Sequence, residues 1–139
     1  MNKGGVMLKS YKHRLYPSKK QIVKLEATLD TCRHLYNNAL GSRKLQAELY
    51  RLPIEKQWIT VKTQSKALPL VYSQVLQNVL RRVSKSFDNF FRRIKNYELP
   101  GYPRIKSYTR YNSFTYPQST NNAFRIINNK KLRHCLIIQ

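Results

Sequence analysis

Apolar residues recur every three or four positions over the first helical stretch that the sequence predicts. The stretch starts after Pro17, with Ser18 as a candidate N-cap, and it stops at Gly41. Its apolar positions would share one face of a helix, and they are Ile22, Leu25, Leu29, Cys32, Tyr36, Ala39 and Leu40. This spacing predicts an amphipathic helix over residues 18–41.

Three more helical pieces are predicted after Gly41. A second helix is expected over residues 42–52, where Pro53 breaks it, and a weaker turn over residues 60–68. A long helix is expected to start at Ser73, as its N-cap, and to reach Ile94. Its apolar positions again follow the helical period, and they are Leu76, Val79, Leu80, Val83, Phe87, Phe90, Phe91 and Ile94.

Strands are predicted at both ends of the chain. Residues 8–15 alternate and end at a proline, which cannot donate to a sheet. After Ile94, prolines at positions 100, 103 and 117 exclude a helix and favour extended backbone. Strands are expected there at residues 113–116, 124–127 and 130–138, with a turn at Asn128 and Asn129.

The charge of the chain points to a polyanionic partner. Its 139 residues include 27 Lys and Arg against 6 Asp and Glu, a formal net charge of +21, while 41% of the residues are apolar and can form a core. Nucleic acid is the commonest such partner. No apolar run is long enough for a membrane span or a signal peptide, so no membrane partner and a cytoplasmic location are expected.

The acidic residues argue against an enzyme. A two-metal nuclease needs several carboxylates around one pair of ions, yet only Glu26 and Asp30 are spaced to share a helix face. Cys32 and Cys135 are far apart and form no C-x-x-C pair, and a cysteine on the apolar stripe is usually inert core. The sequence therefore predicts no catalytic residue, no metal site and no cofactor.

Tyrosines and cations are interleaved in one segment. Half of the ten tyrosines fall between residues 97 and 116, together with Arg104, Lys106 and Arg110. Such a mixture can stack bases and hold phosphates, although the same tyrosines could simply pack a small barrel. The candidates for base stacking are Tyr102, Tyr108 and Tyr111.

Six short motifs occur in a fixed order along the chain. They are Arg14-Leu15-Tyr16-Pro17, Cys32-Arg33-His34-Leu35-Tyr36-Asn37-Asn38-Ala39-Leu40, Ser73-Gln74-Val75-Leu76-Gln77, Phe87-Asp88-Asn89-Phe90-Phe91, Gly101-Tyr102-Pro103-Arg104-Ile105-Lys106 and Ser113-Phe114-Thr115-Tyr116-Pro117-Gln118. From about Leu8 to Leu132 the chain thereby resembles the N-terminal part of TnpB, the OrfB protein of small insertion-sequence transposons.

The resemblance implies an α+β fold and a nucleic-acid-binding function. A helical recognition lobe of three to four helices, residues 17–96, would be inserted into a small and not necessarily complete antiparallel β-barrel, the wedge, formed by residues 1–16 and 97–139. The partners would be a guide-type RNA and a short transposon-adjacent duplex DNA motif. The RuvC nuclease domain and zinc ribbon of such proteins lie beyond these motifs, and the chain departs from the family pattern at residues 133–139. A truncated chain without its own nuclease site is therefore expected.

The resemblance also suggests which residues bind nucleic acid. Ser73, Gln74 and Gln77 would reach the DNA motif from the helix start, with Thr115 beside them, and glutamine can bond an adenine edge. For Ser73 an ordinary N-cap, and for the glutamines a solvated turn, remain alternatives. Backbone contacts are expected from Lys12, Arg14, Arg33, Arg81, Arg82, Lys85, Arg104, Lys106 and Arg110. Asn37 and Asn38 are expected to fix helix packing by hydrogen bonding.

Three other functions remain open at this point. A helix-turn-helix DNA binder would use helices 18–40 and 42–52, which meet at Gly41. An active nuclease or transposase is disfavoured by the scattered acids. A truncated remnant without a function would expose an unpaired strand edge and would aggregate.

Overall fold

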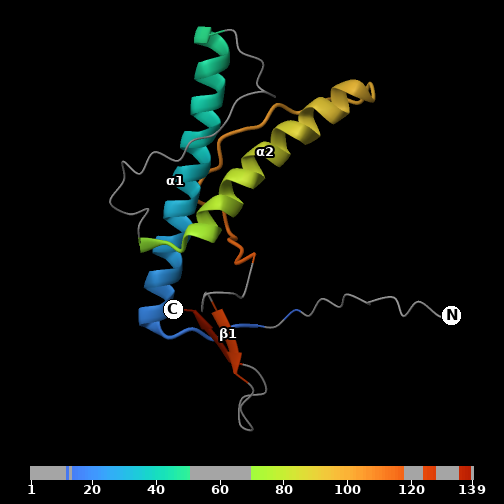
Figure 1. Ribbon diagram of the computed structural model, residues 1–139. Coiled ribbons are helices and arrows are strands. Elements are labelled where there is room, and N and C mark those ends of the chain that lie inside the picture. Colours follow the sequence, from blue (N-terminus) through green and yellow to red (C-terminus); the bar gives the residue numbers. More distant parts are fainter. Residues whose placement is uncertain (1–11, 13, 51–69, 118–123, 128–134, 139) are drawn as a thin grey trace, which may run out of the picture.

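The computed structural model describes residues 12, 14–50, 70–117, 124–127 and 135–138 of the chain. These residues form helix α1, Lys19–Tyr50, helix α2, Ser73–Lys95, and two strands, β1, Phe124–Ile127, and β2, Cys135–Ile138 (Figure 1). The helices cross near the start of α2, and their far ends diverge (Figure 1). Residues 97–117 run back along the two helices without forming either a helix or a strand.

Helix α1 starts with a reciprocal cap. The backbone N–H of Gln21 donates to Ser18 Oγ at 3.4 Å, and the backbone N–H of Ser18 donates to Gln21 Oε1 at 2.8 Å. This Ser-x-x-Gln capping box satisfies two backbone donors at the helix start. The prediction that Ser18 caps this helix is confirmed.

Helix α1 continues through Gly41, so the prediction of two helices that meet there is wrong. Gly41 has no positive φ, and it lies inside the continuous helix Lys19–Tyr50. A glycine inside a helix costs only about 1 kcal/mol relative to alanine. Leu40 and Arg43 are buried on either side of it, so packing outweighs that cost. The turn that a helix-turn-helix over residues 18–52 would need at Gly41 is absent.

Helix α2 has the predicted length but a different N-cap. Tyr72, with ψ 129°, occupies the cap position, and its carbonyl accepts the N–H of Val75 at 2.9 Å. No side chain caps this end, and Ser73 is the first helical residue. The prediction of Ser73 as an N-cap is therefore wrong, which leaves its hydroxyl exposed on the first turn.

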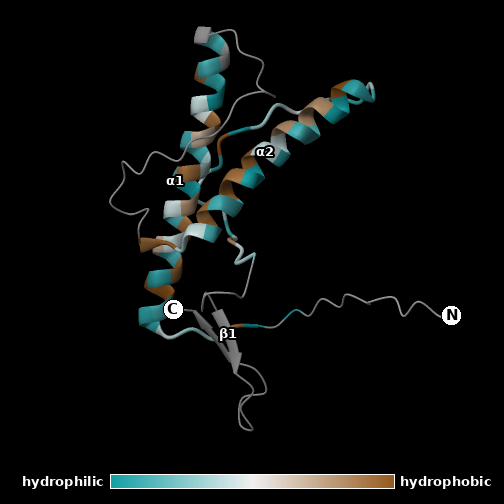
Figure 2. Cartoon of the chain, viewed as in Figure 1, coloured by the Kyte–Doolittle hydropathy of each residue, from teal (hydrophilic) through white to brown (hydrophobic). Residues whose placement is uncertain are grey.

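The core lies between the two helices. Both helices contribute to it from their predicted apolar faces, as the brown bands in Figure 2 show. Its buried members are Cys32, Leu35, Tyr36, Ala39, Leu40, Val75, Leu76, Val79, Val83, Phe87 and Tyr111. Ile22 was predicted on the same face but is exposed, because the first turns of α1 extend beyond α2 (Figure 1).

Residues 97–117 are held by side chains of the helices and not by a neighbouring strand. The Asn37 amide donates from Nδ2 to the carbonyl of Lys106 at 2.9 Å, and its Oδ1 accepts the N–H of Lys106 at 2.9 Å. This pair of bonds imitates one rung of a sheet. The expected strand at residues 113–116 is absent. Asn37 forms hydrogen bonds as predicted, but they hold the segment 97–117 and not a second helix, and Asn38, predicted with it, is exposed.

The two strands form only a short ribbon. They pair antiparallel, with Phe124 opposite Ile138 and Ile127 opposite Cys135. The prediction of an α+β fold with a β-barrel is wrong, because the packed body in the described residues consists of two helices and a barrel would need more strands than this pair. Within those residues there are also fewer helices than the three to four expected.

Three sequence predictions fall largely or wholly outside the described residues. Of the predicted strand 8–15, only residues 12, 14 and 15 are described, and they have no strand partner within the described part. The turns predicted at residues 60–68 and at Asn128 and Asn129 lie outside the described residues.

Replacing Asn37 tests the contact that anchors residues 97–117. We expect Asn37→Ala to lower the free energy of unfolding by about 1 to 2 kcal/mol, because two hydrogen bonds to Lys106 are lost at a half-buried site. Urea unfolding followed by circular dichroism measures this change. The exposed neighbour gives the control, Asn38→Ala. Equal stability of the two variants would show that the Asn37 bonds contribute nothing.

Candidate nucleic-acid interface

One row of polar and basic side chains follows the outer face of α2. Its members are spaced by four residues, so they lie on one side of the helix, and all are exposed: Ser73, Gln77, Arg81 and Lys85. Val75, Val79 and Val83 point the other way, into the core. Within the described residues, no ion pair engages Arg81 or Lys85. We call these four residues the α2 row.

Gln74 does not belong to the α2 row. Its side chain is half-buried, with Oε1 away from solvent, whereas Gln77 is exposed. The structure therefore separates the two glutamines that the sequence placed together at the DNA groove. Ser73 and Gln77 remain free to meet a ligand from outside, while Gln74 faces the protein.

Arg82 binds residues 113–115. Its Nη1 donates to the carbonyl of Ser113 at 2.7 Å, and its Nη2 donates to Thr115 Oγ1 at 2.8 Å. Its Nε donates to Asn78 Oδ1 at 3.1 Å, which fixes the guanidinium on α2. Arg82 and Thr115, two predicted nucleic-acid contacts, are thus brought together and contact each other. Arg82 therefore holds residues 113–115 against α2, whereas its neighbour Arg81 faces solvent.

Lys106 lies between two aromatic rings. Its Nζ is 4.9 Å from the centroid of the Tyr36 ring and 5.7 Å from that of Tyr111. A cation over aromatic faces is attracted by their electron density. Together with the bonds from Asn37, these contacts fasten Lys106 to α1, and its half-buried side chain is directed at the rings.

Arg33 is paired with an acid of its own helix. Its Nη2 donates to Asp30 Oδ1, and His34 Nε2 lies 3.4 Å from the other carboxylate oxygen. The hydrogen bond from Arg33 lowers the pKa of Asp30 below its usual value. The Arg33 side chain is half-buried, so its charge is largely used within α1.

The other predicted backbone contacts are exposed. Arg14 lies over the ring of Tyr16, 5.3 Å from its centroid. Lys12 precedes it, and Arg104 and Arg110 lie on the extended residues 97–117. All four cations face solvent and can meet phosphates.

The three tyrosines proposed for base stacking differ in exposure. Tyr111 is 4% exposed and packs at 5.9 Å from Tyr36, and burial raises its pKa to about 12. Tyr102 contacts Phe87 and Phe90 edge to face, at 5.9 and 5.3 Å. Tyr108 is 66% exposed. Two of the rings therefore pack against the helices, and only Tyr108 of the three offers a largely open face.

Arg43 is a buried cation that the sequence did not suggest. It is 9% exposed, its Nη2 donates to Ser84 Oγ at 3.0 Å, and its guanidinium lies 5.3 Å from the Phe87 ring centroid. Burial lowers its pKa, while the negative charge of Asp88 raises it. The sequence signal for this burial was the position of Arg43, three residues after Leu40, which continues the buried face of α1 past Gly41.

Metal and thiol chemistry find little support here. Within the described residues, no group of three or more His, Cys, Asp or Glu side chains is arranged to hold a metal ion. Cys32 is buried as a free thiol, and burial raises its pKa to about 11, so its reactive thiolate form is disfavoured. Among the described helices, none is both long and apolar enough to cross a bilayer.

A comparison with protein families finds a match in the N-terminal part of the chain. Residues 7–49 match the family model HTH_OrfB_IS605, described as a helix-turn-helix domain. The match supports an N-terminal helix-turn-helix domain of the OrfB type. A domain of this class suggests DNA binding. No curated protein and no solved structure matches the chain.

The matched segment has one helix in this structure. Of residues 7–49, those from Lys19 onward form α1 without a turn. In the described part of the chain, the helix that packs against α1 is α2, which lies outside the match. Within the described part of the matched segment, the structure therefore does not contain the turn that the family description names.

Replacing Arg82 separates its structural contacts from the charge of its neighbour. We expect Arg82→Ala to lower the free energy of unfolding by about 1 to 2 kcal/mol, because bonds from a charged donor to Ser113 and Thr115 are lost. Thermal unfolding measures the change. The matched control, Arg81→Ala, removes the same side chain one position earlier and should leave stability within about 0.5 kcal/mol. If both variants unfold alike, Arg82 does not hold residues 113–115.

Proposed function

We propose that this chain is a nucleic-acid-binding fragment of a TnpB-like transposon protein. It would bind a short transposon-adjacent DNA duplex and a guide-type RNA, and it would carry no nuclease site of its own. The observation that carries the DNA part is the α2 row, in which two exposed cations follow an exposed serine and glutamine on one helix face. The family match to residues 7–49 and the net charge of +21 support it.

The α2 row has the composition of a groove-reading helix. A glutamine amide can bond the edge of an adenine with two hydrogen bonds, and Gln77 is exposed to do so. Ser73, one turn earlier, can bond a base edge or a phosphate. Arg81 and Lys85, one and two turns later, can hold the phosphates that fix the register of the helix on the duplex.

Thr115 lies close to the same part of α2. Its hydroxyl accepts from Arg82, and Arg82 also bonds Asn78, the residue after Gln77. This chain of contacts holds the extended segment near the middle of the α2 row. The hydrogen bonds from Arg82 to Asn78 and Thr115 therefore support the proposal that Gln77 and Thr115 contact one DNA motif together.

The RNA part of the proposal concerns another surface. Arg104, Tyr108 and Arg110 are exposed on residues 97–117, and Tyr108 lies between the two arginines in the sequence. Single-stranded RNA is bound by such combinations, because bases stack on aromatic rings while cations hold phosphates. Lys12 and Arg14 add positive charge from the start of the chain.

The absence of a nuclease site remains a proposal that rests on how the acids are distributed. Five of the six acids lie in the described part, at Glu26, Asp30, Glu48, Asp88 and Glu98. Among them, Asp30 is engaged by Arg33 and Glu98 lies 3.9 Å from Arg93. Two of the five acids lie beside arginines, and the five are spread over α1, α2 and the segment after α2, which supports the proposal that no cluster for two-metal cleavage is present.

The contribution of the cations in the α2 row can be measured through salt. We expect Arg81→Ala to weaken binding to every duplex and to reduce the slope of log K against log salt by about 0.9, the value for one lost phosphate contact. Fluorescence anisotropy at several salt concentrations measures both quantities. Lys44→Ala, which removes an exposed cation from α1, is the control. An unchanged slope for Arg81→Ala would remove Arg81 from the interface.

Base reading by Gln77 predicts a different pattern. After a preferred duplex has been selected from a random library, Gln77→Ala should weaken binding to it by about 1 to 3 kcal/mol, with little change on random duplex. Asn89→Ala, which removes another exposed amide of α2, should change neither. Equal losses on both duplexes would mean that Gln77 contributes to affinity without reading a base.

A further inference from the structure

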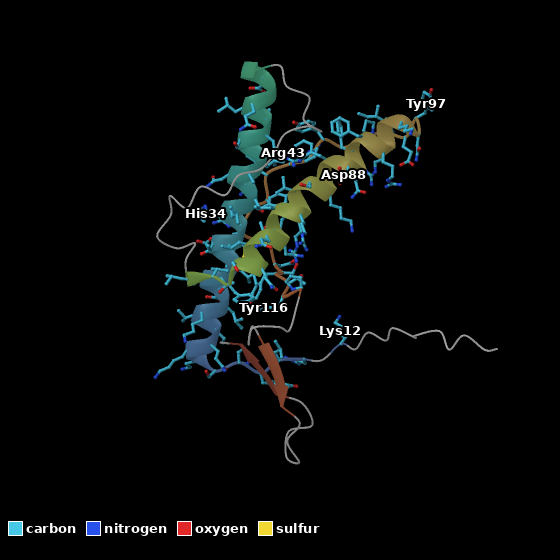
Figure 3. All side chains as sticks on the ribbon, in the orientation of Figure 1. Lys12, His34, Arg43, Asp88, Tyr97 and Tyr116 are labelled. Atoms are coloured by element: carbon cyan, nitrogen blue, oxygen red, sulfur yellow. The ribbon has the colours of Figure 1, made fainter. Side chains whose placement is uncertain are left out.

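The C-terminal end of α2 carries apolar side chains that nothing in the described chain covers. This end projects away from α1, and Tyr97 lies at its tip (Figure 3). The Tyr97 side chain is 100% exposed, and Ile94 and Leu99 beside it are also exposed. Exposed aromatic and aliphatic groups gathered at one point of a surface often mark a binding site.

The backbone holds Tyr97 in an unusual conformation. Its φ of 56° is the only positive φ of a non-glycine residue in the described chain. The N–H of Tyr97 donates to the carbonyl of Ile94 at 3.1 Å, and the N–H of Glu98 donates to that of Arg93 at 2.9 Å. These two bonds form a Schellman motif, in which the residue at this position is usually glycine.

A tyrosine at this position has a conformational cost without a packing gain. The left-handed conformation is unfavourable for residues with a side chain, and glycine adopts it freely. Full exposure shows that the ring gains no core contact in the described structure to offset that cost. Backbone strain of this kind is often found at functional sites. The arrangement presents an aromatic ring to solvent from a backbone that two hydrogen bonds hold in place.

The charge around the ring selects the kind of ligand. Arg92, Arg93 and Lys95 occupy the last turn of α2, and the nearest acids in sequence are Asp88, four residues before Arg92, and Glu98. Arg93 lies 3.9 Å from Glu98, whereas Arg92 and Lys95 are exposed and form no ion pair within the described residues. A second copy of this chain would bring like charges together, whereas a nucleic acid would be attracted.

We propose that Tyr97 is a stacking platform for an unpaired base of single-stranded DNA, with Arg92 and Lys95 on the flanking phosphates. An aromatic ring stacks on the face of a base of any sequence, and nearby cations follow the backbone. This site goes beyond the proposed duplex contact, because it lies past the end of the α2 row and takes bases that a duplex keeps stacked. It does not require that Gln77 or Arg81 contact DNA.

The test compares oligonucleotides with and without bases. The full chain is titrated into fluorescein-labelled (dT)12 and into an abasic strand of the same length. Tyr97→Leu and Tyr97→Gly should weaken binding to (dT)12 by about tenfold, as expected for one lost stacking contact, and should leave binding to the abasic strand unchanged. Tyr97→Phe keeps the ring and should bind (dT)12 as the natural chain does.

Tyr97→Gly also separates a binding effect from unfolding. Glycine relieves the left-handed strain, so this variant should unfold at the same or a higher temperature while it binds (dT)12 more weakly. Binding of (dT)12 by Tyr97→Leu at the natural affinity would overturn the proposal. An equal loss of affinity for the abasic strand in Tyr97→Leu would also overturn the proposal. A loss of affinity found only with (rU)12 would overturn it too, because it would assign the stacking platform to RNA.

The same variants distinguish this proposal from that for the duplex. Tyr97→Leu should bind duplex DNA with unchanged affinity, because the α2 row is intact. Suppose that the natural chain binds (dT)12 but no duplex, and that Tyr97→Leu binds (dT)12 more weakly. The duplex proposal then fails and the stacking proposal stands. A change of oligomeric state in Tyr97→Leu, seen by sedimentation with (dT)12 binding intact, would instead assign the tip to protein association and overturn the stacking site.

Discussion

The packing of α1 against α2 is the interaction on which the rest of the described structure depends. Cys32, Tyr36 and Leu40 of α1 meet Val75, Val79 and Val83 of α2 in one apolar seam. Burial of such side chains is the main favourable contribution to folding. Because the seam fixes the rotation of α2, it also decides which of its cations point to solvent. Arg81 and Lys85 face outward because the valines face inward.

Polar side chains then attach the extended residues 97–117 to this helical pair. Asn37 of α1 binds the backbone of Lys106, and Arg82 of α2 binds Ser113 and Thr115. Tyr111, between these two attachments, inserts into the core. A segment without its own secondary structure must place its backbone donors and acceptors elsewhere, and here helix side chains provide partners for some of them. The DNA-facing proposal for Thr115 depends on this attachment.

The amphipathic helices were predictable because their burial follows the helical period. The predicted stripes from Cys32 to Leu40 and from Leu76 to Phe87 mark most of the two packed faces, whereas the buried Leu35 and Val75 were not predicted. Gly41 was misleading, since its local preference for ending a helix was outweighed by packing of Leu40 and Arg43 on both sides. The barrel was expected from resemblance and from β-branched and aromatic residues, and residues 113–116 instead find their partner in a side chain, which periodicity cannot reveal.

The candidate site was predictable as a surface but not residue by residue. Arg81 and Arg82 are adjacent and chemically identical, and only the crossing of the helices decides that one faces solvent and the other holds Thr115. In the same way, Tyr111 is buried and Tyr102, although 39% exposed, packs edge to face against Phe87 and Phe90, while Tyr108 is 66% exposed. Tyr97 had no sequence signal beyond its residue type, because its significance arises from a backbone conformation and from full exposure.

The central claim is that the outer face of α2 contacts DNA while the cations that hold residues 97–117 do not. Lysine acetylation read by mass spectrometry, with and without duplex DNA, tests this claim most directly. Lys85 is exposed on the α2 row, Lys44 is exposed on α1, and Lys106 lies against Tyr36 and Tyr111. The account predicts that DNA protects Lys85, leaves Lys44 reactive, and does not change the slow labelling of Lys106. Labelling of Lys85 that is unaffected by saturating duplex would contradict it.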